Sequence, residues 1–373
     1  MSLPATSGVR ESQDYNESGG AVKKPNPARR DCPGAGDVSA YNRAPSKTLV
    51  RTARMRAKAR AQPNIALIKY WGKRDVERNL PAVGSLSITL DSLWTTMDVE
   101  FAPDESCDSL GVNGRPEMRM LPRVSACLDR IAGSDRPRAR VTSECNFPIA
   151  AGLASSASSF AALAVAASAA CGQDLDALAL ARAAGAASGS AARSLFGGFV
   201  ELEPGDDDID LDVLRPAADW PLRVVVAVTA TGPKPLSSGQ AMQRSAGTSP
   251  FYRRWIDQQP ADLAAARAAV ESRDFAALAD VSEHNCLKMH SVMWTARPPV
   301  VYWNNTTLEC MSVVTALRDR GESVFFTIDA GPQVKAVCLP GSERNVVEAL
   351  AAIGGVEAVM TSGLGDGARL LGG

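Results

Sequence analysis

A dense cationic and aromatic cluster follows an apolar run in the first third of the chain. The run Ile65–Ile68 switches abruptly to Lys69–Arg74, which reads lysine, tyrosine, tryptophan, glycine, lysine and arginine. The apolar run predicts a short core strand whose end delivers these side chains into a site. Ammonium, guanidinium and phenol groups at this spacing suit a polyanionic ligand. The alternative is a strand that ends in a solvated basic turn.

A second segment could bind phosphate. Residues 148–157 form a loop rich in glycine, alanine and serine that runs directly into an alanine-rich helix. A helix N-terminus presents free backbone N–H groups and the positive end of the helix dipole, which favour an anion. The hydroxyls of Ser155 and Ser156 can reach a phosphate or a phosphate-bound Mg²⁺. The segment has no Gly-Lys-Ser/Thr and is therefore not a Walker A motif; a serine-capped helix with an alanine core is the alternative.

Two charged residues could complete a site for an anionic substrate. Arg193 lies among small polar residues in Ser188–Gly198, and its guanidinium fork suits a carboxylate or a phosphate. Asp329 follows the apolar strand Phe325–Ile328 and precedes Ala-Gly-Pro. A carboxylate at the end of an apolar strand is costly unless it is paired or functional. The alternatives are a structural salt bridge for Arg193 and a turn cap for Asp329.

The composition of the 373 residues narrows the chemistry. The chain has two histidines, His284 and His290, which argues against a histidine triad or a histidine-rich metal site. Catalysis must then rest on carboxylates, lysines, arginines or backbone dipoles. The net charge of −1 gives no general attraction to nucleic acid or membranes, so anion binding must be local. The eight cysteines form no CxxC pair and no dense framework, which suits free thiols in a reducing compartment.

Strand and helix patterns without regular alternation predict an α+β fold with two domains, residues 55–218 and 219–373. Residues 1–54 lack apolar periodicity and are expected to be disordered, with Met55 as an alternative start. No apolar run reaches about 18 residues, so no membrane-spanning helix is expected. Trp255–Gln259 is expected at the surface, and His290 is expected to pack within a helix.

The expected elements follow the apolar patterns. Strands are expected at 64–69, 85–90, 94–101, 138–145, 199–202, 222–229, 324–328 and 334–339. Helices are expected directly after the loop at 148–157 and at 119–132, 174–187, 239–247, 261–270, 274–290, 306–319 and 346–353.

Together these motifs resemble the mevalonate diphosphate decarboxylase family, within the superfamily of galactokinase, homoserine kinase, mevalonate kinase and phosphomevalonate kinase. Asn64–Asp75 is similar to the family segment Asn-Ile-Ala-x-Ile-Lys-Tyr-Trp-Gly-Lys-Arg-Asp. Asn146–Ser156 resembles the family's phosphate loop, and Ser188–Glu201 resembles its Ser-Gly-Ser-Ala-x-Arg-Ser-Leu-x-Gly-Gly-Phe-Val-Glu segment. Asp329–Pro332 resembles its Asp-Ala-Gly-Pro signature. Two positions depart from the pattern: Ala82-Val83-Gly84-Ser85 stands where the family has Asn-Ser-Ser, and Gln333 stands where asparagine is usual.

The resemblance implies a ribosomal-protein-S5-like N-terminal domain that binds ATP, a ferredoxin-like C-terminal domain that carries Asp329, and a deep cleft between them. It implies ATP-dependent decarboxylation of (R)-5-diphosphomevalonate to isopentenyl diphosphate, ADP, phosphate and CO₂, in isoprenoid biosynthesis. ATP and Mg²⁺ are the implied cofactors, with Mg²⁺ held through ATP and at most by Ser155 rather than at a dedicated site. A cytoplasmic homodimer is also implied, with no nucleic-acid or membrane partner.

The resemblance also implies a role for each matching residue. Asp329 would accept or orient the proton of the substrate's C3 hydroxyl, and Lys69 would neutralise phosphoryl oxygens and lower the pKa of Asp329. Arg193 would hold the substrate carboxylate with help from Asn64. The residues implied for the rest of the substrate are Tyr70, Lys73, Ser188, Gly189 and Ser190. The residues implied for ATP are Gly152, Leu153, Ala154, Ser155, Ser156 and Ala157.

Three alternative functions remain open. The nearest alternative function is a decarboxylase that acts on 5-phosphomevalonate. The intact Lys-Tyr-Trp-Gly-Lys segment favours the diphosphate substrate over this monophosphate. A small-molecule kinase of the superfamily has no need of Arg193 aimed at a carboxylate. A non-catalytic ligand sensor would be expected to lose Asp329, Lys69 or Arg193, and the sequence retains all three.

Overall fold

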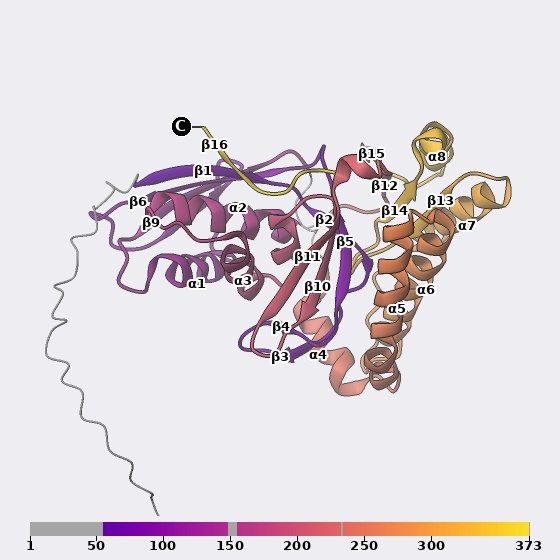
Figure 1. The fold of residues 1–373 in the computed structure, drawn as a ribbon, viewed down its shortest axis with the longest axis horizontal. Coiled ribbons are helices and arrows are strands. Elements are labelled where there is room, and N and C mark those ends of the chain that lie inside the picture. Colours follow the sequence, from indigo (N-terminus) through magenta and orange to yellow (C-terminus); the bar gives the residue numbers. More distant parts are fainter. Residues whose placement is uncertain (1–54, 148–154, 233, 373) are drawn as a thin grey trace, which may run out of the picture. The chain divides into compact units, whose positions relative to one another are not determined.

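The computed structural model describes residues 55–147, 155–232 and 234–372, which form the helices and sheets of an α+β fold (Figure 1). The predicted fold class is therefore confirmed. The expectations for residues 1–54 and for Gly152, Leu153 and Ala154 lie outside the described residues. In the described chain, no helix combines the length and apolar character needed to cross a bilayer.

The first sheet joins the two ends of the described chain. Its six strands lie in the order β16-β1-β6-β9-β7-β8, antiparallel except for the parallel pair β7 and β9. Helix α2 lies against this sheet, and helices α1 and α3 pack against α2 (Figure 1). The strands and helices of this layer are β1 (Arg56–Ala61), β6 (Thr95–Phe101), β7 (Ser109–Val112), β8 (Arg115–Pro116), β9 (Ala139–Cys145), β16 (Arg369–Leu371), α1 (Leu121–Ala132), α2 (Ser155–Ala170) and α3 (Ala177–Ala187).

Helix α2 consists of small and apolar residues and is buried over most of its surface. It contacts β1, β6, α1 and α3, and its alanines let these neighbours approach closely. The hydroxyl of Ser158 is fully buried and is satisfied by Thr95 Oγ1 at 2.8 Å. This packing holds the N-terminus of α2 in a fixed place.

The second sheet carries the segment Asn64–Asp75. Its strand order is β11-β10-β5-β2, all antiparallel, and the chain leaves β2 into a small β3–β4 hairpin. The strands are β2 (Asn64–Ile68), β3 (Lys73–Asp75), β4 (Leu80–Pro81), β5 (Ser85–Thr89), β10 (Phe199–Pro204) and β11 (Ile209–Arg215). A short 3₁₀ helix, η1 (Ala192–Leu195), precedes β10 and contains Arg193.

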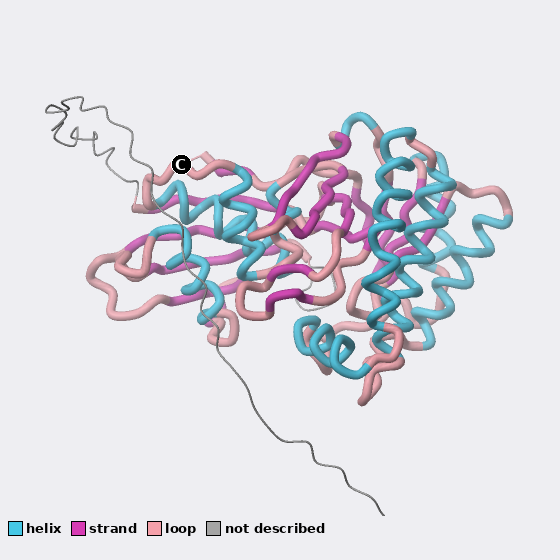
Figure 2. The backbone as a smooth tube through the Cα atoms, turned by 60° about the horizontal axis from the view of Figure 1, so that its bottom comes forward, coloured by secondary structure: helices cyan, strands magenta, loops and turns pink. Residues whose placement is uncertain are grey.

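The third sheet belongs to the C-terminal half and has the antiparallel order β13-β14-β12-β15. Its strands are β12 (Arg223–Val228), β13 (Val324–Thr327), β14 (Val334–Cys338) and β15 (Ala358–Ser362). Long helices lie beside this sheet (Figure 2). The remaining helices are η2 (Ala217–Asp219), α4 (Ser238–Thr248), α5 (Tyr252–Ser272), α6 (Phe275–Trp294), α7 (Asn305–Asp319), η3 (Pro340–Ser342) and α8 (Glu343–Ala351).

One hydrophobic core spans the second and third sheets and fixes them against each other. It contains Leu67 and Ile88 from the second sheet, Val224 and Phe325 from the third, and Val270 from α5, all completely buried. Helix α5 contacts the second sheet, and helix α6 contacts strands of both sheets. The end of β2 is thereby held next to the end of β13, where Asp329 follows.

Two glycines in the matched segments are required by close backbone contacts. Gly198 has φ +71°, and a Cβ atom there would lie 2.2 Å from the carbonyl oxygen of Arg215. A Cβ on Gly365 would lie 2.4 Å from the carbonyl oxygen of Leu90. The turn at Gly363–Gly367 therefore packs backbone to backbone against the strand ends of the N-terminal half.

The sequence predicted most helices and strands, but it missed several strands and placed two buried residues at the surface. The predicted core strands and helices are present, with ends shifted by a few residues. Strands β1, β3, β4, β7, β8, β11, β15 and β16 were not predicted. The expected surface position of Trp255–Gln259 is wrong for two residues, because Trp255 and Gln259 are buried inside α5, which begins earlier than the pattern indicated.

Candidate active site

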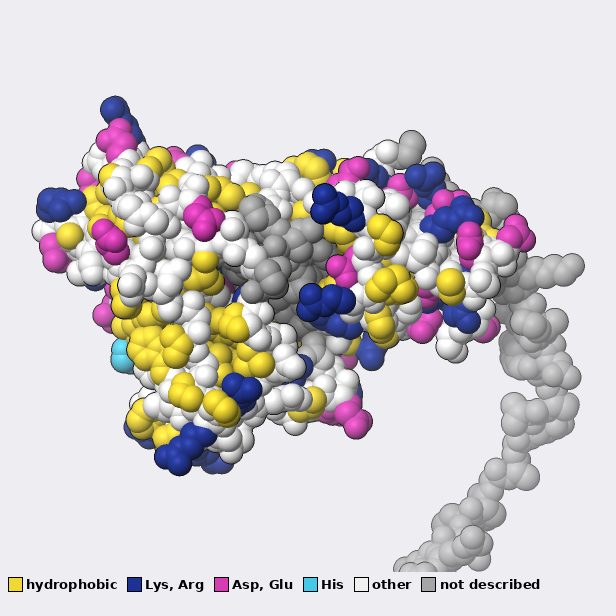
Figure 3. Space-filling view, turned by 180° about the vertical axis from the view of Figure 1, so that it is seen from behind, with side chains coloured by type: hydrophobic (Ala, Val, Ile, Leu, Met, Phe, Trp, Pro, Cys, Tyr) yellow, Lys and Arg dark blue, Asp and Glu magenta, His cyan; other side chains and the backbone are white. Residues whose placement is uncertain are grey.

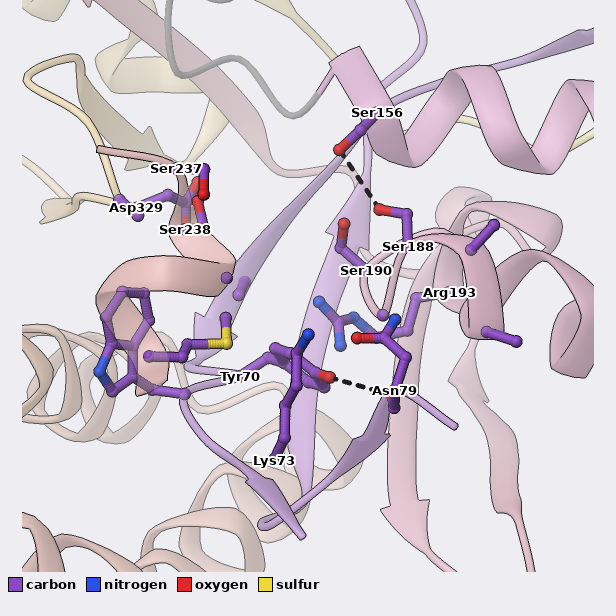
Figure 4. A pocket seen from close by; sticks show the side chains of 18 of the residues that line it. Tyr70, Lys73, Asn79, Ser156, Ser188, Ser190, Arg193, Ser237, Ser238 and Asp329 are labelled. Carbon is purple, nitrogen blue, oxygen red and sulfur yellow. Dashed lines mark hydrogen bonds between the residues drawn. The ribbon is translucent and has the colours of Figure 1, made fainter. Parts of the chain in front are cut away.

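Most of the predicted site residues line a single pocket of about 660 Å³. Its walls come from the end of β2, the face of α1, the start of α2, the loop before η1, the start of α4 and the turn after β13 (Figure 4). The predicted residues that line it are Asn64, Lys69, Tyr70, Lys73, Ser155, Ser156, Ser188, Gly189, Ser190, Arg193 and Asp329. Ala157 instead lies in the interior of α2, with no exposed surface.

Asp329 is held by two lysines. Lys69 Nζ lies 2.8 Å from Oδ1 of Asp329, and Lys335 Nζ lies 3.2 Å from Oδ2. Both lysines are 1% exposed, whereas the Asp329 side chain keeps 24% of its surface open. Burial opposes ionisation of Asp329, but the two ammonium groups outweigh it and hold the pKa of this carboxyl well below its usual range. Asp329 is therefore a carboxylate that is ionised at neutral pH and faces the pocket.

Arg193 is a buried cation surrounded by neutral acceptors. Its guanidinium donates to Ser85 Oγ at 2.6 Å, to Ser87 Oγ at 2.9 Å and to Asn64 Oδ1 at 3.3 Å. Burial lowers the pKa of Arg193 to about 10, which leaves it charged at neutral pH. Within the described residues, no carboxylate forms a salt bridge with it. Its charge is therefore available to an anion that enters the pocket.

Asn64 links Arg193 to the loop that precedes it. Its amide nitrogen donates to the carbonyl oxygen of Ser190 at 2.9 Å and to Ser194 Oγ at 2.8 Å. The amide oxygen is thereby left to face the guanidinium of Arg193. Ser85, which lies in the segment that departs from the family pattern, contributes a direct hydrogen bond to Arg193.

Helix α6 positions both partners of the Lys69–Asp329 pair. Asn285 accepts the backbone N–H of Lys69 at 2.8 Å. Cys286 Sγ accepts the backbone N–H of Ile328 at 3.2 Å, and His290 Nε2 lies 3.2 Å from the carbonyl oxygen of Ile328. Burial lowers the pKa of His290 to about 3, so this histidine is neutral. The prediction that His290 packs within a helix is confirmed.

Gln259 from α5 completes this support. Its Nε2 donates to the carbonyl oxygen of Lys69 at 2.8 Å, and its Oε1 accepts from Asn285 at 2.9 Å. Trp255 Nε1 donates to the carbonyl oxygen of Trp71 at 2.9 Å. These bonds satisfy the backbone where β2 ends, which is why a segment that looked like surface is buried.

A basic edge lies across the pocket from Asp329. Burial raises the pKa of Tyr70 to about 12, so its phenol stays protonated, and it makes a long 3.5 Å contact to the carbonyl oxygen of Asn79 (Figure 4). Burial and the charge of nearby Arg123 lower the pKa of Lys73. Arg123 on α1 lines the pocket as well. Two cations that repel each other at a pocket wall favour binding of an anion between them.

Two helix N-termini face the same pocket. Ser155 and Ser156 begin α2, and Ser156 Oγ lies 3.3 Å from Ser188 Oγ. Ser237 caps α4 and Ser238 is its first residue. Figure 4 shows Ser237 and Ser238 on one side, next to Asp329, and Ser156 and Ser188 on the other. Backbone dipoles and hydroxyls therefore converge on the pocket from two directions.

Sequence reasoning missed three cations of the site. Lys335 lies in an otherwise apolar strand, where a buried charge requires a partner, so its position was a usable signal. Lys234 donates to the carbonyl oxygen of Ala330 at 2.7 Å and to Ser238 Oγ at 3.0 Å. Burial lowers the pKa of Lys234 to about 8, and the charge of Lys335 adds to this effect. Arg123 lies on the exposed side of an amphipathic helix, which gives no sequence signal.

Gln333, the second departure from the family pattern, stabilises the fold through two hydrogen bonds. Its side chain accepts the backbone N–H of Thr229 and donates to the carbonyl oxygen of Ala230, both at 2.6 Å. These two bonds tie the Ala-Gly-Pro turn to the end of β12.

In the described residues, no group of three or more histidine, cysteine, aspartate or glutamate side chains could hold a metal ion. Among the residues that the structure describes, the pocket is lined by two carboxylates, Glu77 and Asp329, of which the two lysines already engage Asp329. Its other side-chain oxygens belong to Asn64, Tyr70, Asn79, Ser155, Ser156, Ser188, Ser190, Ser237 and Ser238. Hydroxyls are suitable as occasional ligands of a Mg²⁺ that is held mainly by phosphates.

Family models match most of the described chain. Residues 61–213 match the model of a diphosphomevalonate decarboxylase-like N-terminal domain, and residues 224–363 match the model of the mevalonate 5-diphosphate decarboxylase C-terminal domain. The chain belongs to the diphosphomevalonate decarboxylase family. The family predicted from the sequence motifs is confirmed.

Individual relatives agree with this family. The diphosphomevalonate decarboxylase of Candida albicans is 35% identical over 297 residues, which are 74% of this chain and 82% of the relative. The human diphosphomevalonate decarboxylase is 35% identical over 319 residues, which are 79% of this chain and 78% of the relative.

Solved structures of the family have the same fold. The Staphylococcus aureus mevalonate diphosphate decarboxylase superposes with a TM-score of 0.80 at 34% identity, covering 85% of this chain and 98% of that one. The structure of MDDEF in complex with MVAPP, AMPPCP and magnesium superposes with a TM-score of 0.80 at 36% identity, with coverage of 85% and 98%. The predicted two-domain fold of the kinase superfamily is therefore confirmed.

Replacing Gln259 with leucine tests how the end of β2 is held. Gln259→Leu leaves the buried carbonyl of Lys69 and the amide of Asn285 without their partner, which costs about 1–3 kcal/mol of unfolding free energy. Urea unfolding followed by tryptophan fluorescence measures this loss. Gln258→Leu, at the adjacent half-buried position, is the control. Equal stability of the two variants would contradict the structural role of Gln259.

Proposed function

We propose that this protein decarboxylates (R)-5-diphosphomevalonate with ATP, giving isopentenyl diphosphate, ADP, phosphate and CO₂. The observation that carries this proposal is one pocket that holds the ionised Asp329 and the buried, carboxylate-free Arg193. A substrate with a hydroxyl to be phosphorylated and a carboxylate to be lost needs these two groups together. The ligands of the MDDEF structure, MVAPP, AMPPCP and magnesium, support the same substrates here.

The reaction begins with transfer of the γ-phosphoryl group of ATP to the C3 oxygen, which loses its proton as the O–P bond forms. Asp329 orients the C3 hydroxyl and accepts or passes on this proton. The C3–O bond then breaks with phosphate as the leaving group, and positive charge develops at C3. The C1–C2 bond breaks, CO₂ leaves, and its electron pair forms the C2=C3 double bond. A fixed carboxylate beside C3 stabilises the developing cation.

Arg193 holds the substrate carboxylate during these steps. Its guanidinium is fixed by Ser85, Ser87 and Asn64, so it offers its charge in one orientation. A carboxylate held in this way keeps the C1–C2 bond aligned with the departing phosphate. The buried hydroxyls satisfy Arg193 without neutralising it, which suits a transient anionic partner.

The basic edge binds the substrate's phosphate groups. Tyr70, Lys73, Ser188, Gly189 and Ser190 form this edge, and Arg123 adds a second cation beside Lys73. Two cations suit a diphosphate better than a monophosphate, because the diphosphate carries more charge over a longer span. The nearest alternative remains a decarboxylase of 5-phosphomevalonate, which would need fewer of these contacts.

ATP binds at the other end of the pocket. Ser155 and Ser156 at the start of α2, with the preceding Gly152, Leu153 and Ala154, would contact its phosphates. Lys234 joins the start of α4 at Ser238 to the Asp329 turn at Ala330. Its ammonium group would offset the charge of the transferred phosphoryl group, and the Ser238 hydroxyl lies beside it. Mg²⁺ bound to ATP neutralises phosphate charge, and the Ser155 hydroxyl is the residue best suited to reach it. Residues 55–218 would form the ATP-binding domain, and residues 219–373 the domain that carries Asp329.

A paired assay tests the reaction. With ATP, Mg²⁺ and 5-diphosphomevalonate we expect equal amounts of CO₂ and ADP, and with 5-phosphomevalonate a much lower kcat/KM. Release of CO₂ from a ¹⁴C1-labelled substrate and coupled ADP detection measure both products. ADP formation without CO₂ would identify a kinase, and no CO₂ with either substrate would refute the proposal.

Asp329→Asn tests the catalytic assignment. We expect kcat to fall by about 10²–10⁴-fold while substrate still binds, because the neutral amide neither takes the proton nor stabilises charge at C3. Steady-state kinetics and isothermal titration with diphosphomevalonate measure the two effects separately. Asp319→Asn, on the exposed end of α7, is the control. An unchanged kcat in Asp329→Asn would contradict the assignment.

Location and assembly are also proposals. All described cysteines are free thiols, which supports a cytoplasmic enzyme. Figure 3 shows hydrophobic side chains gathered on one face of the molecule, and the exposed residues of the α6–α7 region include Leu287, Trp294, Val301 and Leu308. An exposed patch of this kind favours a homodimer.

Light scattering at micromolar concentration should give twice the mass of one chain. Trp294→Arg places a charge in the exposed patch and should lower the measured mass towards that of a monomer. A monomeric wild-type protein would overturn the proposal.

A further inference from the structure

Lys335 approaches Asp329 from the side that faces away from the pocket. It lies on β14, six residues after Asp329, and its ammonium group contacts Oδ2 at 3.2 Å. Lys69 contacts the other oxygen, Oδ1, at 2.8 Å. The carboxylate is therefore held at both oxygens by cations from different sheets. Each oxygen has a second lone pair, which leaves Asp329 able to accept a further hydrogen bond from the pocket.

Lys335 lies outside the lining of the proposed substrate pocket, as the described residues define it. Its side chain is 1% exposed, and it does not line the 660 Å³ pocket that contains Asp329, Lys69 and Arg193. It lines instead a separate cavity of about 10 Å³, together with Asp329, Asn64 and apolar side chains. A cavity of this size has room for one water molecule at most. Among the described residues that line the pocket, Asp329 forms an ion pair with Lys335, so the effect of Lys335 on the reaction is tested through this carboxylate.

We propose that Lys335 is a positioning residue for the decarboxylation: it anchors the rear oxygen of Asp329 and keeps this carboxylate ionised while the substrate's negative charges crowd the pocket. The proposal rests on the proposed function, because it assigns Asp329 its role at C3. It adds a second cation to the Lys69–Asp329 pair.

The charges around Asp329 explain why one lysine is insufficient. The substrate brings a carboxylate and phosphate groups, and ATP adds more negative charge, all of which favour protonation of a nearby carboxyl. Lys69 lines the pocket and faces these anions, whereas Lys335 is shielded from them. The titratable and charged groups that face Asp329 are Lys69 at the end of β2, Lys335 on β14, Lys234 before α4, Arg193 in η1, and Cys286 and His290 on α6.

This arrangement also bears on how Asp329 acts. A carboxylate whose pKa is held well below its usual range is a weak base, so it takes a proton only late in phosphoryl transfer. It remains negative when the C3–O bond breaks, which is when a negative charge is needed beside C3. The second lysine therefore favours stabilisation of the C3 cation over early removal of the hydroxyl proton.

The acid limb of the pH profile tests the proposal. In the enzyme–substrate complex, the bound anions raise the pKa of Asp329, and kcat is lost as pH falls through this pKa. Removing the Lys335 charge in Lys335→Met raises the pKa further, so the acid limb of the kcat profile moves upward by about one to three pH units. The loss of kcat relative to wild type therefore grows as pH falls. ATP-dependent CO₂ release from diphosphomevalonate, measured at each pH, gives the profile, and substrate ionisations are the same for every variant.

Three further variants separate charge from packing. Lys335→Arg keeps the charge and restores the wild-type limb at least in part, whereas Lys335→Gln keeps a donor without the charge and behaves like Lys335→Met. Val337→Ala, at a buried apolar position of the same strand, lowers stability but leaves the limb in place. Urea unfolding at each pH measures whether each variant is folded. If Lys335→Met does not fold, Lys335→Gln serves as the uncharged variant.

The outcomes are distinguishable. An upward shift in Lys335→Met and Lys335→Gln that Lys335→Arg reverses supports the proposal. An unmoved limb in the uncharged variants, or the same shift in Val337→Ala, overturns it. Absence of CO₂ release from the wild-type protein would instead overturn the proposed function.

Discussion

The ion pair between Lys69 and Asp329 is the interaction on which the rest of the site depends. Its two residues are 260 positions apart, and it joins the end of β2 to the turn after β13. A buried pair stabilises a structure only when its geometry is fixed and its neighbours are satisfied. Helix α6 meets both needs, because Asn285 binds the backbone beside one partner and Cys286 and His290 bind the backbone beside the other.

The same pocket contains a second buried charge, Arg193, whose hydrogen-bond partners are neutral rather than oppositely charged. Asp329 is paired with two ammonium groups, so it stays ionised at every physiological pH. Arg193 is surrounded by hydroxyl and amide oxygens, which satisfy its N–H groups but leave its charge uncompensated. Desolvating such a cation costs free energy, which an incoming carboxylate recovers. One pocket thus holds a fixed anion, which we propose stabilises the developing cation, and an uncompensated cation, which we propose binds the substrate carboxylate.

The packing behind the pocket explains how small residues support this chemistry. The alanines of α2 let the helix lie deep in the N-terminal layer, which fixes its N-terminus at the pocket wall. Gly198 and Gly365 let the backbone of the C-terminal turn meet the ends of the N-terminal strands. The two halves of the chain are thereby held together around the pocket that contains Arg193 and Asp329.

The local chemistry can be predicted from the amino-acid sequence: a basic strand end, a helix start rich in small residues, an arginine among serines and an aspartate after an apolar strand. The sequence also predicted the α+β class and the main core elements, because their apolar patterns are strong. It did not predict β1, whose alternation of arginine or lysine with alanine has little apolar weight, or the burial of Gln259, which looks polar in sequence. Only the tertiary structure decided the partners. Lys335, Gln259 and Asn285 act through contacts between residues far apart in the chain or in different elements, and no local pattern records such contacts.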